Sequence, residues 1–299
     1  IATDVAKYDL GSTGEYTQGA GAVALLLSSK PKIISFSDNW STSHKSAFDF
    51  FKPYRRVSKF MITGNDDNQP WFGNLEAEIE VHKDQPVFDG QYSNDCYVQR
   101  TNEAYARFKD NTTGKPLQDW FGIMMHLPYA YQGRRMLTAL YAKEYDIDAT
   151  DAAALKEVAK NIEYGDFIKQ KLAPAETASS LIGNLYTGSI FMSLLSSLCG
   201  YASSEQDLTG ERFGFLAYGS GSKSKVFEGT IASGWRAAAH TNLFERLSKS
   251  TAISFEDYEG LHTKTRHFSI LEPQGEWVLD RIEHEKTNLE GARYYQWID

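Results

Sequence analysis

The hydrophobic positions of this 299-residue chain fall into short continuous runs and longer segments of helical periodicity. Residues 19–27 form a continuous apolar run after two glycines, which is typical of a strand buried on both faces. Residues 32–36 have the pattern of a neighbouring strand, and residues 1–8 are also strand-like. These runs predict a sheet covered on both sides near the start of the chain.

The segment from residue 43 to about residue 95 is irregular and rich in aromatic residues. A polar turn at residues 64–68 interrupts it. We expect loops and a short hairpin here, with an insertion at residues 65–73 whose role the pattern does not indicate.

Helical periodicity returns at residues 94–109, and residues 122–126 form a short apolar strand that ends at a histidine. A helix is predicted from about residue 131 to 145. A second helix should carry Leu155, Val158, Ala159 and Ile162 on one face, and residues 190–198 should form a more fully buried one.

Two further strands are predicted at residues 213–217 and 226–231, with an amphipathic helix after Gly234. This mixture of helices and strands predicts an α/β fold, and it argues against an all-α protein or a β-sandwich.

Composition narrows the class of protein. With 41% hydrophobic and 23% charged residues the chain is in the globular range, and its net charge of −8 argues against a nucleic-acid-binding protein. The longest apolar stretch, residues 190–198, is too short to span a membrane. Two cysteines without a CxxC pair favour the reducing cytoplasm, and no metal site is indicated. The strand-like start at Ile1 predicts a cleaved, split or truncated polypeptide.

His126 is the first candidate for chemistry, because it follows an apolar strand and precedes Pro128. The carboxyl end of a strand is where α/β folds place their ligand clefts. A histidine satisfied within the core is the alternative interpretation.

Other candidates lie on the following segments. Tyr131 and Arg135 share a helix face, next to Arg134, and arginine side chains suit phosphate, although a solvated face is the alternative. Asn184 precedes the buried helix and is either a ligand-binding residue or an N-cap. The turn at residues 219–222 is either a plain hairpin turn or a loop whose backbone N–H groups bind an oxyanion.

Taken in order, these segments resemble the hydroxymethylglutaryl-CoA synthases, and their sequences are closer to those of the bacterial members. The resemblance is carried by DVAKY (4–8), TQGAGAVA (17–24), FDFFKP (48–53), SNDCY (93–97), HLPY (126–129), NLYTGS (184–189) and YGSG (218–221). It implies a thiolase-like five-layer α/β/α/β/α fold. This chain would give the last strands of the N-terminal half (1–40), a connecting region with family-specific loops and an insertion (41–118), and the C-terminal half (119–299).

The resemblance also implies an activity, the condensation of acetyl-CoA with acetoacetyl-CoA to hydroxymethylglutaryl-CoA and free CoA in the mevalonate pathway of isoprenoid biosynthesis. A cysteine would be acetylated, a glutamate would remove a methyl proton, and the enolate would attack the ketone. CoA thioesters would be substrates, and no cofactor or metal would be needed.

Site roles follow from the same resemblance, residue by residue. His126 would polarise the carbonyl under attack, Asn184 would help to hold the acyl group, and the Ser220 backbone N–H would stabilise the thioester oxyanion. Substrate contacts are expected from Thr17, Ser93, Tyr131, Arg135, Asn184, Tyr218 and Ser220, and support of the site from Asp4 and Asp49.

Two departures from the family pattern matter. Neither Cys96 nor Cys199 lies in the motif of the nucleophile, so the catalytic cysteine and glutamate are expected on a missing N-terminal segment or a separate chain. At Tyr131 the family usually has a lysine that binds CoA phosphate.

Three functions therefore stay open. They are hydroxymethylglutaryl-CoA synthesis, a β-branching synthase that acts on acyl-carrier-protein thioesters, and a non-catalytic thiolase-fold scaffold subunit. The expected partners are the N-terminal half as a separate polypeptide and a second copy in a homodimer of the completed cytoplasmic enzyme.

Overall fold

The computed structural model describes residues 1–71, 73–82, 85–149, 151–239 and 241–299. Contacts between backbone positions divide the chain into two units. The first comprises Ile1–Phe51 and Asp84–Ser250, and the second comprises Lys52–Lys83 and Thr251–Asp299. Each unit is described by itself.

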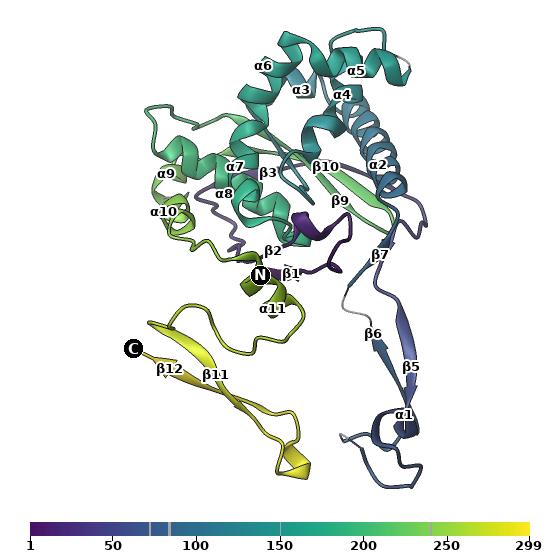
Figure 1. Cartoon of the computed structure of the whole chain (residues 1–299). Coiled ribbons are helices and arrows are strands. Elements are labelled where there is room, and N and C mark those ends of the chain that lie inside the picture. Colours follow the sequence, from purple (N-terminus) through teal and green to yellow (C-terminus); the bar gives the residue numbers. More distant parts are fainter. Residues whose placement is uncertain (72, 83–84, 150, 240) are drawn as a thin grey trace. The chain divides into compact units, whose positions relative to one another are not determined.

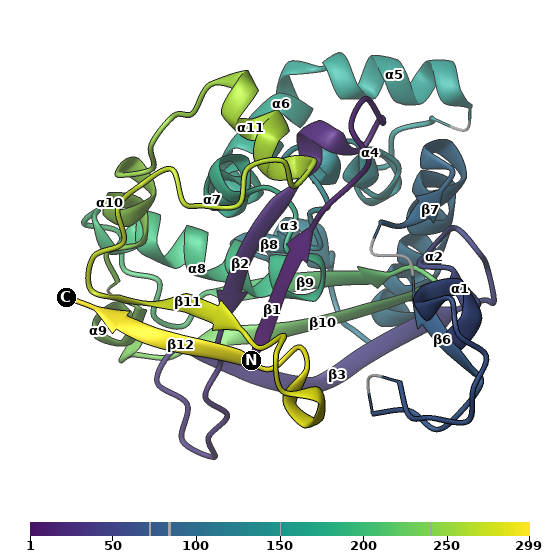
Figure 2. The same ribbon diagram turned by 60° about the horizontal axis from the view of Figure 1, so that its bottom comes forward.

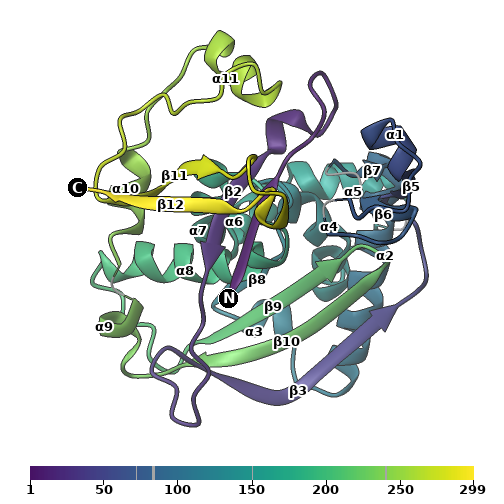
Figure 3. The same cartoon turned by 90° about the horizontal axis from the view of Figure 1, so that it is seen from below.

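A four-stranded sheet forms the centre of the first unit, with strand order β3-β10-β9-β8 (Figure 3). The strands are β3 (Ile34–His44), β10 (Lys223–Ile231), β9 (Arg212–Gly219) and β8 (Gly122–Met125). β10 pairs antiparallel with both β3 and β9, whereas β8 runs parallel to β9. The predicted strands at residues 122–126, 213–217 and 226–231 are confirmed.

Helices surround this sheet (Figure 1). The helices of the unit are α2 (Gly90–Asp110), α3 (Pro116–Asp119), α4 (Gln132–Glu144), α5 (Ala152–Lys160), α6 (Ile162–Lys171), α7 (Ala173–Ile182), α8 (Ser189–Ala202), α9 (Trp235–Ala239) and α10 (Leu243–Ser248). The predicted helices at 94–109, 131–145 and 190–198, and the one after Gly234, are therefore present.

Both faces of the sheet are buried, because alternate residues of a strand point to opposite sides. On one face Leu216 and Val226 pack with side chains of α2 and α4. On the other face Phe213 and Phe215 pack with side chains of α8 and α9. This layered arrangement is the mixed α/β architecture expected from the sequence.

The prediction of a single helix that includes Leu155 and Ile162 is wrong. α5 ends at Lys160, and Asn161 caps α6 by accepting a hydrogen bond from the Glu163 N–H (2.9 Å). Asparagine competes with the helix backbone in this way at helix starts. Ile162 therefore belongs to a different helix from Leu155, and it is exposed.

The expectation for the start of the chain is also corrected. Strand β2 covers only Gly19–Val23, and Leu26 and Leu27 are exposed, so residues 19–27 are not a strand buried on both faces. β2 pairs with β1 (Ala2–Ala6), as antiparallel neighbours. The strand predicted at 32–36 is not its neighbour, because β3 pairs with β10. Strand pairing is a non-local choice that a local apolar run does not encode.

The predicted domain boundaries fall within continuous elements. β3 runs through positions 40 and 41, and α3 runs through positions 118 and 119. The assignment of these segments to the two thiolase halves stays a prediction.

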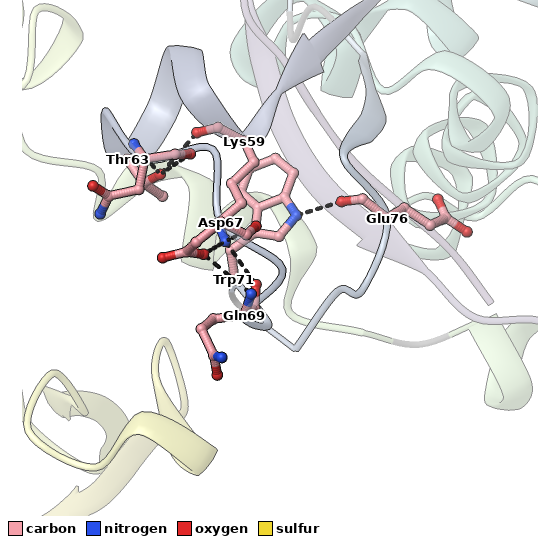
Figure 4. Close-up of polar contacts among 7 residues, drawn as sticks. Lys59, Thr63, Asp67, Gln69, Trp71 and Glu76 are labelled. Atoms are coloured by element: carbon pink, nitrogen blue, oxygen red, sulfur yellow. Dashed lines mark hydrogen bonds and ion pairs between the residues drawn. The ribbon is translucent and has the colours of Figure 1, made fainter.

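Residues 50–88 contain two antiparallel strand pairs, β4 (Phe50–Phe51) with β7 (Val87–Phe88) and β5 (Tyr54–Ser58) with β6 (Glu78–His82). The short helix α1 (Lys59–Thr63) follows β5. The Lys59 ammonium donates to the backbone oxygens of Asp67 (2.8 Å) and Gln69 (2.7 Å) and pairs with the Asp67 carboxylate (Figure 4). The buried Lys59 thus contacts the expected insertion at 65–73, of which Phe72 is outside the described residues, and the Trp71 indole N–H also donates to the Glu76 carbonyl (2.6 Å).

The remaining part of the second unit follows residue 250. It contains α11 (Phe255–His262), the 3-10 helix η3 (Thr287–Leu289) and an antiparallel pair, β11 (Glu276–Ile282) with β12 (Arg293–Ile298), whose elements are labelled in Figure 2 except for η3. Trp277 and Trp297 face each other across this pair.

Candidate active site

His126 is the residue directly after β8, and its backbone N–H continues the parallel ladder by donating to the Leu216 carbonyl (3.2 Å). Its ring Nδ1 lies 2.7 Å from the hydroxyl of Ser189, the first residue of α8. The imidazole is thus held between the carboxyl end of β8, the outer strand of the sheet, and the start of the buried helix α8, both labelled in Figure 3.

Burial controls the protonation of this histidine. It lowers the pKa of His126 to about 4, and a hydrogen bond to the Tyr186 backbone acts in the opposite direction. The ring is therefore neutral at physiological pH, so that one nitrogen can donate a hydrogen bond while the other accepts one.

Asn184 lies on the segment before α8 and is fully buried. Its side-chain oxygen accepts from the Tyr186 N–H (2.8 Å), and its amide nitrogen donates to the Tyr8 hydroxyl (3.2 Å). Its backbone N–H donates to the Thr17 carbonyl (3.1 Å). Asn184 is not the N-cap of α8, a position that Gly188 occupies.

The Asn184 contacts link this segment to the start of the chain. Thr17 ends the 3-10 helix η1 (Glu15–Thr17), and its hydroxyl donates to the Gly14 carbonyl (2.7 Å). Gly183 follows α7 with φ +83°, and a Cβ there would lie 2.0 Å from the Gln18 carbonyl oxygen. This close approach requires glycine.

Asp49 organises a second group of predicted residues. Its buried carboxylate accepts hydrogen bonds from the Tyr218 hydroxyl (2.6 Å), the Gly221 N–H (2.8 Å) and the Ser93 hydroxyl (3.4 Å). It therefore ties the turn after β9 to the first turns of α2. Burial and the neighbouring Asp49 charge raise the pKa of Tyr218, so its hydroxyl stays protonated and donates to this carboxylate.

Tyr97 joins the two groups. Its ring stacks on the ring of Tyr218 with a centroid distance of 4.4 Å, and its hydroxyl donates to the His126 carbonyl (2.7 Å). The ring centroids of His126 and Tyr218 are 6.4 Å apart. The structure thus brings His126, Asn184, Asp49, Ser93 and Tyr218 into one connected region of the first unit.

The remaining predicted residues lie nearer to solvent. Ser220 is exposed in the turn, where its side chain hydrogen-bonds with Tyr218. Asp4 is exposed on β1, where its carboxylate accepts from the Val5 N–H (2.9 Å), and it contributes to the electrostatics of Tyr186.

The two arginines after His126 have different environments. Arg134 makes a two-pronged hydrogen bond with the buried Glu176 carboxylate and lies over the Tyr131 ring, so its charge is already paired. Arg135 is exposed and contacts the Gln91 side-chain oxygen at 3.5 Å, near the start of α2. Of the two guanidinium groups, Arg135 is the one open to an anionic ligand.

Sequence reasoning assigned no separate role to Ser189 or Tyr97. Each contacts His126 from a helix far along the chain, at sequence separations of 63 and 29 positions. No local spacing signals such contacts. Both residues lie within segments that carried the family resemblance, and this was the available signal.

The arrangement has the parts of an acid–base site for carbonyl chemistry. A neutral imidazole at a strand end can donate a hydrogen bond to a developing alkoxide. The turn that follows the neighbouring strand β9 contains glycine and is anchored by Asp49, and its backbone N–H groups can stabilise an oxyanion. Over the described residues, no group of three or more His, Cys, Asp or Glu side chains could hold a metal ion. Among the helices of the described ranges, none is long and apolar enough to cross a membrane.

The chain has a fold of the thiolase-like class, as comparison with solved structures shows. MvaS in complex with 3-hydroxy-3-methylglutaryl coenzyme A matches 99% of the chain at 25% identity and a TM-score of 0.74, over 66% of its own length. The curacin-pathway HMG synthase in complex with apo donor-ACP shares the fold with a TM-score of 0.72 at 18% identity.

Within that class, the chain resembles the hydroxymethylglutaryl-CoA synthases. A family model for the C-terminal region of these enzymes matches residues 135–276. The hydroxymethylglutaryl-CoA synthase of Enterococcus faecalis is 29% identical over 89% of the chain, and that of Haloferax volcanii is 27% identical over 93%. The chain spans 57% and 64% of the lengths of these two relatives. The resemblance and fold class expected from the sequence are confirmed.

Proposed function

We propose that this chain forms part of a condensing enzyme that joins acetyl-CoA to acetoacetyl-CoA. Free CoA leaves when the cysteine is acetylated, and water then hydrolyses the thioester between the condensed acyl group and the cysteine to release hydroxymethylglutaryl-CoA. The catalytic cysteine and glutamate lie outside these 299 residues, on a further segment or a separate polypeptide. The observation that carries the proposal is the position of His126, a neutral imidazole at the end of β8, connected to Asn184 through Tyr186 and to Asp49 through Tyr97 and Tyr218.

His126 acts on the second substrate. Its ring donates a hydrogen bond to the ketone oxygen of acetoacetyl-CoA, and the donated proton stabilises the alkoxide as the carbon–carbon bond forms. The low pKa of His126 suits this role, because a neutral imidazole does not bring a buried positive charge into the site.

The turn at Ser220 supplies the oxyanion contact for the thioester. Asp49 fixes this turn by accepting the Gly221 N–H and the Tyr218 hydroxyl. A preorganised backbone donor stabilises developing charge without reorganisation during the reaction. Asp49 supports the site, and Asn184 and Thr17 hold the segment that faces the acyl group. The role of Asp4 is also supporting.

CoA phosphate binds at the exposed edge near Arg135, with Ser93 and Tyr131 nearby on α2 and before α4. Because Arg134 is paired with Glu176, the positive charge for phosphate comes from Arg135.

The same observation favours a second candidate function. A carrier-protein thioester lacks the nucleotide phosphates of CoA, and a site with only one unpaired arginine and Tyr131 in place of a lysine suits it.

Reconstitution tests the proposed function. The chain is combined with a cysteine-bearing polypeptide that copurifies with it, and free CoA is measured after addition of acetyl-CoA and acetoacetyl-CoA. We expect release of CoA and formation of hydroxymethylglutaryl-CoA. Activity only with acyl-carrier-protein thioesters supports the second candidate, and no condensation with either donor supports a scaffold subunit. The completed enzyme is expected to be a cytoplasmic homodimer that requires no cofactor.

A further inference from the structure

Ser189 has no role in the function proposed above, yet it contacts the ring of His126. It is buried at the first position of α8, and its Oγ lies 2.7 Å from His126 Nδ1. The backbone N–H of Leu127 donates to the same Oγ (3.2 Å). The hydroxyl is thus held by the two residues that follow β8.

The donors and acceptors around the Ser189 hydroxyl determine where its hydrogen atom points. A serine hydroxyl has one donor and two acceptor sites. The Leu127 N–H uses one acceptor site, so the hydroxyl hydrogen needs an acceptor of its own. Across the part of the chain that the structure describes, His126 Nδ1 is the acceptor that it meets at hydrogen-bond distance. A proton on Nδ1 would instead leave a buried hydroxyl hydrogen without a partner, which is unfavourable.

We propose that Ser189 is a positioning residue that fixes the tautomer of His126, with Nδ1 accepting from the Ser189 hydroxyl and the ring proton on Nε2. The consequence for the reaction rests on the proposed function. Nε2 then carries the ring proton: in the free site it is the donor for the Tyr186 backbone, and with substrate bound it is the donor for the carbonyl under attack. Ser189 keeps the proton on this nitrogen before the substrate binds.

The surroundings of Ser189 keep it in this position. The hydroxyl of Ser193, one turn further along α8, donates to the Ser189 carbonyl (3.0 Å) and to the Met125 carbonyl (3.2 Å). The start of α8 is therefore tied to the end of β8 by contacts that do not involve the imidazole. Ser193 is equally buried and does not touch the ring, so it provides a matched control.

Nitrogen NMR of the 299-residue chain, purified with any polypeptide that accompanies it, tests the tautomer directly. The chain is labelled with 15N-histidine, and the His126 signals are assigned with a His126→Gln variant. At pH 7 the depressed pKa keeps the ring neutral, so the two nitrogen shifts report which atom carries the proton. We expect a protonated Nε2 in the parent chain and in Ser193→Ala.

Ser189→Ala should raise the population of the Nδ1-protonated form relative to the Nε2 form by roughly two- to tenfold, the effect of one hydrogen bond. Ser189→Thr keeps the hydroxyl and should restore the parent spectrum. A proton on Nδ1 in the parent chain, donated to Ser189 or to the Tyr186 backbone, overturns the inference. So does a Ser189→Ala spectrum identical to that of the parent.

The same variants separate this inference from the proposed function. In the reconstituted enzyme, Ser189→Ala should lower kcat for condensation by roughly two- to tenfold with little change in KM, and Ser189→Thr should recover it. If the tautomer changes as expected but the parent enzyme performs no condensation, the proposed function fails while the tautomer assignment holds.

Discussion

The ionisation of His126 connects the stability of the fold to pH. Its pKa in the folded chain is about 4, below the value near 6.5 of an unfolded histidine. Above pH 6.5 both states are neutral at this residue. As the pH falls from 6.5 to 4, the unfolded state binds a proton that the folded state does not, so the free energy of unfolding decreases by up to about 3 kcal/mol.

Urea unfolding of the parent and of His126→Gln between pH 7.5 and 4.5 measures this effect. The parent should lose more stability than the variant over this interval. Equal losses would mean that His126 titrates normally in the folded chain.

Arg135 and Arg134 form a test pair because they are adjacent in sequence and differ in environment. Arg135→Ala should raise KM for acetoacetyl-CoA roughly tenfold to hundredfold, equivalent to about 1.5 to 3 kcal/mol, and change kcat much less. The phosphate end of CoA is remote from the bonds being formed, so binding weakens equally in ground and transition states. Higher salt should reduce the difference from the parent.

Arg134→Ala is the control for this measurement. It leaves the buried Glu176 carboxylate without its ion pair, so it should lower the free energy of unfolding by about 1 to 2 kcal/mol, because the arginine itself is 46% exposed. It should leave KM nearly unchanged. A larger KM effect from Arg134 than from Arg135 would contradict the assignment of the phosphate contact.

At the scale of single elements, strand β9 depends on one glycine. A Cβ on Gly214 would lie 2.0 Å from the fully buried Trp120 ring, whose indole nitrogen is fixed by a hydrogen bond to Glu228 (2.7 Å). Gly214→Ala should therefore destabilise the chain by at least about 1 to 3 kcal/mol, since the core cannot accommodate the added methyl group without moving the ring.

Gly200 on α8 supplies the comparison, because a Cβ there meets no atom within 4 Å. Gly200→Ala should stabilise the chain by about 0.5 to 1 kcal/mol through helix propensity. Thermal unfolding of both variants measures the contrast. Similar melting temperatures for the two would show that β9 and Trp120 are not packed as described.

The elements also show what the sequence could predict. Strands β8, β9 and β10 and helices α2, α4 and α8 were recognisable because each carries a local apolar run or period that matches its burial. The pairing of β3 with β10, and the end of β2 at Val23, depend on distant partners and were predicted incorrectly. The break at Asn161 depends on one capping hydrogen bond, which outweighs a helical apolar pattern.

The same distinction applies to the site. His126 was a candidate because of its strand-end position, and Asn184, Asp49 and Tyr218 were candidates because of the family resemblance. The contact of Ser189 with the ring could not, because it joins residues 63 positions apart. Arg134 was expected to add to the charge beside Arg135, and its pairing with Glu176 requires the position of α7.

At the scale of the whole molecule, several apolar side chains of the first unit face solvent. Val5 is 65% exposed on β1, and Leu26 and Leu27 after β2 are 94% and 85% exposed. Exposed apolar groups of this kind near a two-stranded sheet favour association with another polypeptide. We predict that the chain purified alone is inactive and poorly stable.

Mass spectrometry and size exclusion of the purified protein check this prediction. A second, cysteine-bearing polypeptide should copurify with the chain, and its removal should lower the melting temperature. A stable, well-folded monomer without any second polypeptide would exclude this association.

The central claim, that this chain provides the acid–base histidine for the second substrate while the cysteine lies elsewhere, is tested most directly by His126→Ala in the reconstituted enzyme. Acetyl transfer to the cysteine and formation of hydroxymethylglutaryl-CoA are measured separately. Condensation should fall roughly hundredfold or more, the usual contribution of a positioned acid–base group, while acetylation stays near the parent rate. Equal loss of both steps in a variant that remains folded, or undiminished condensation, would contradict the claim.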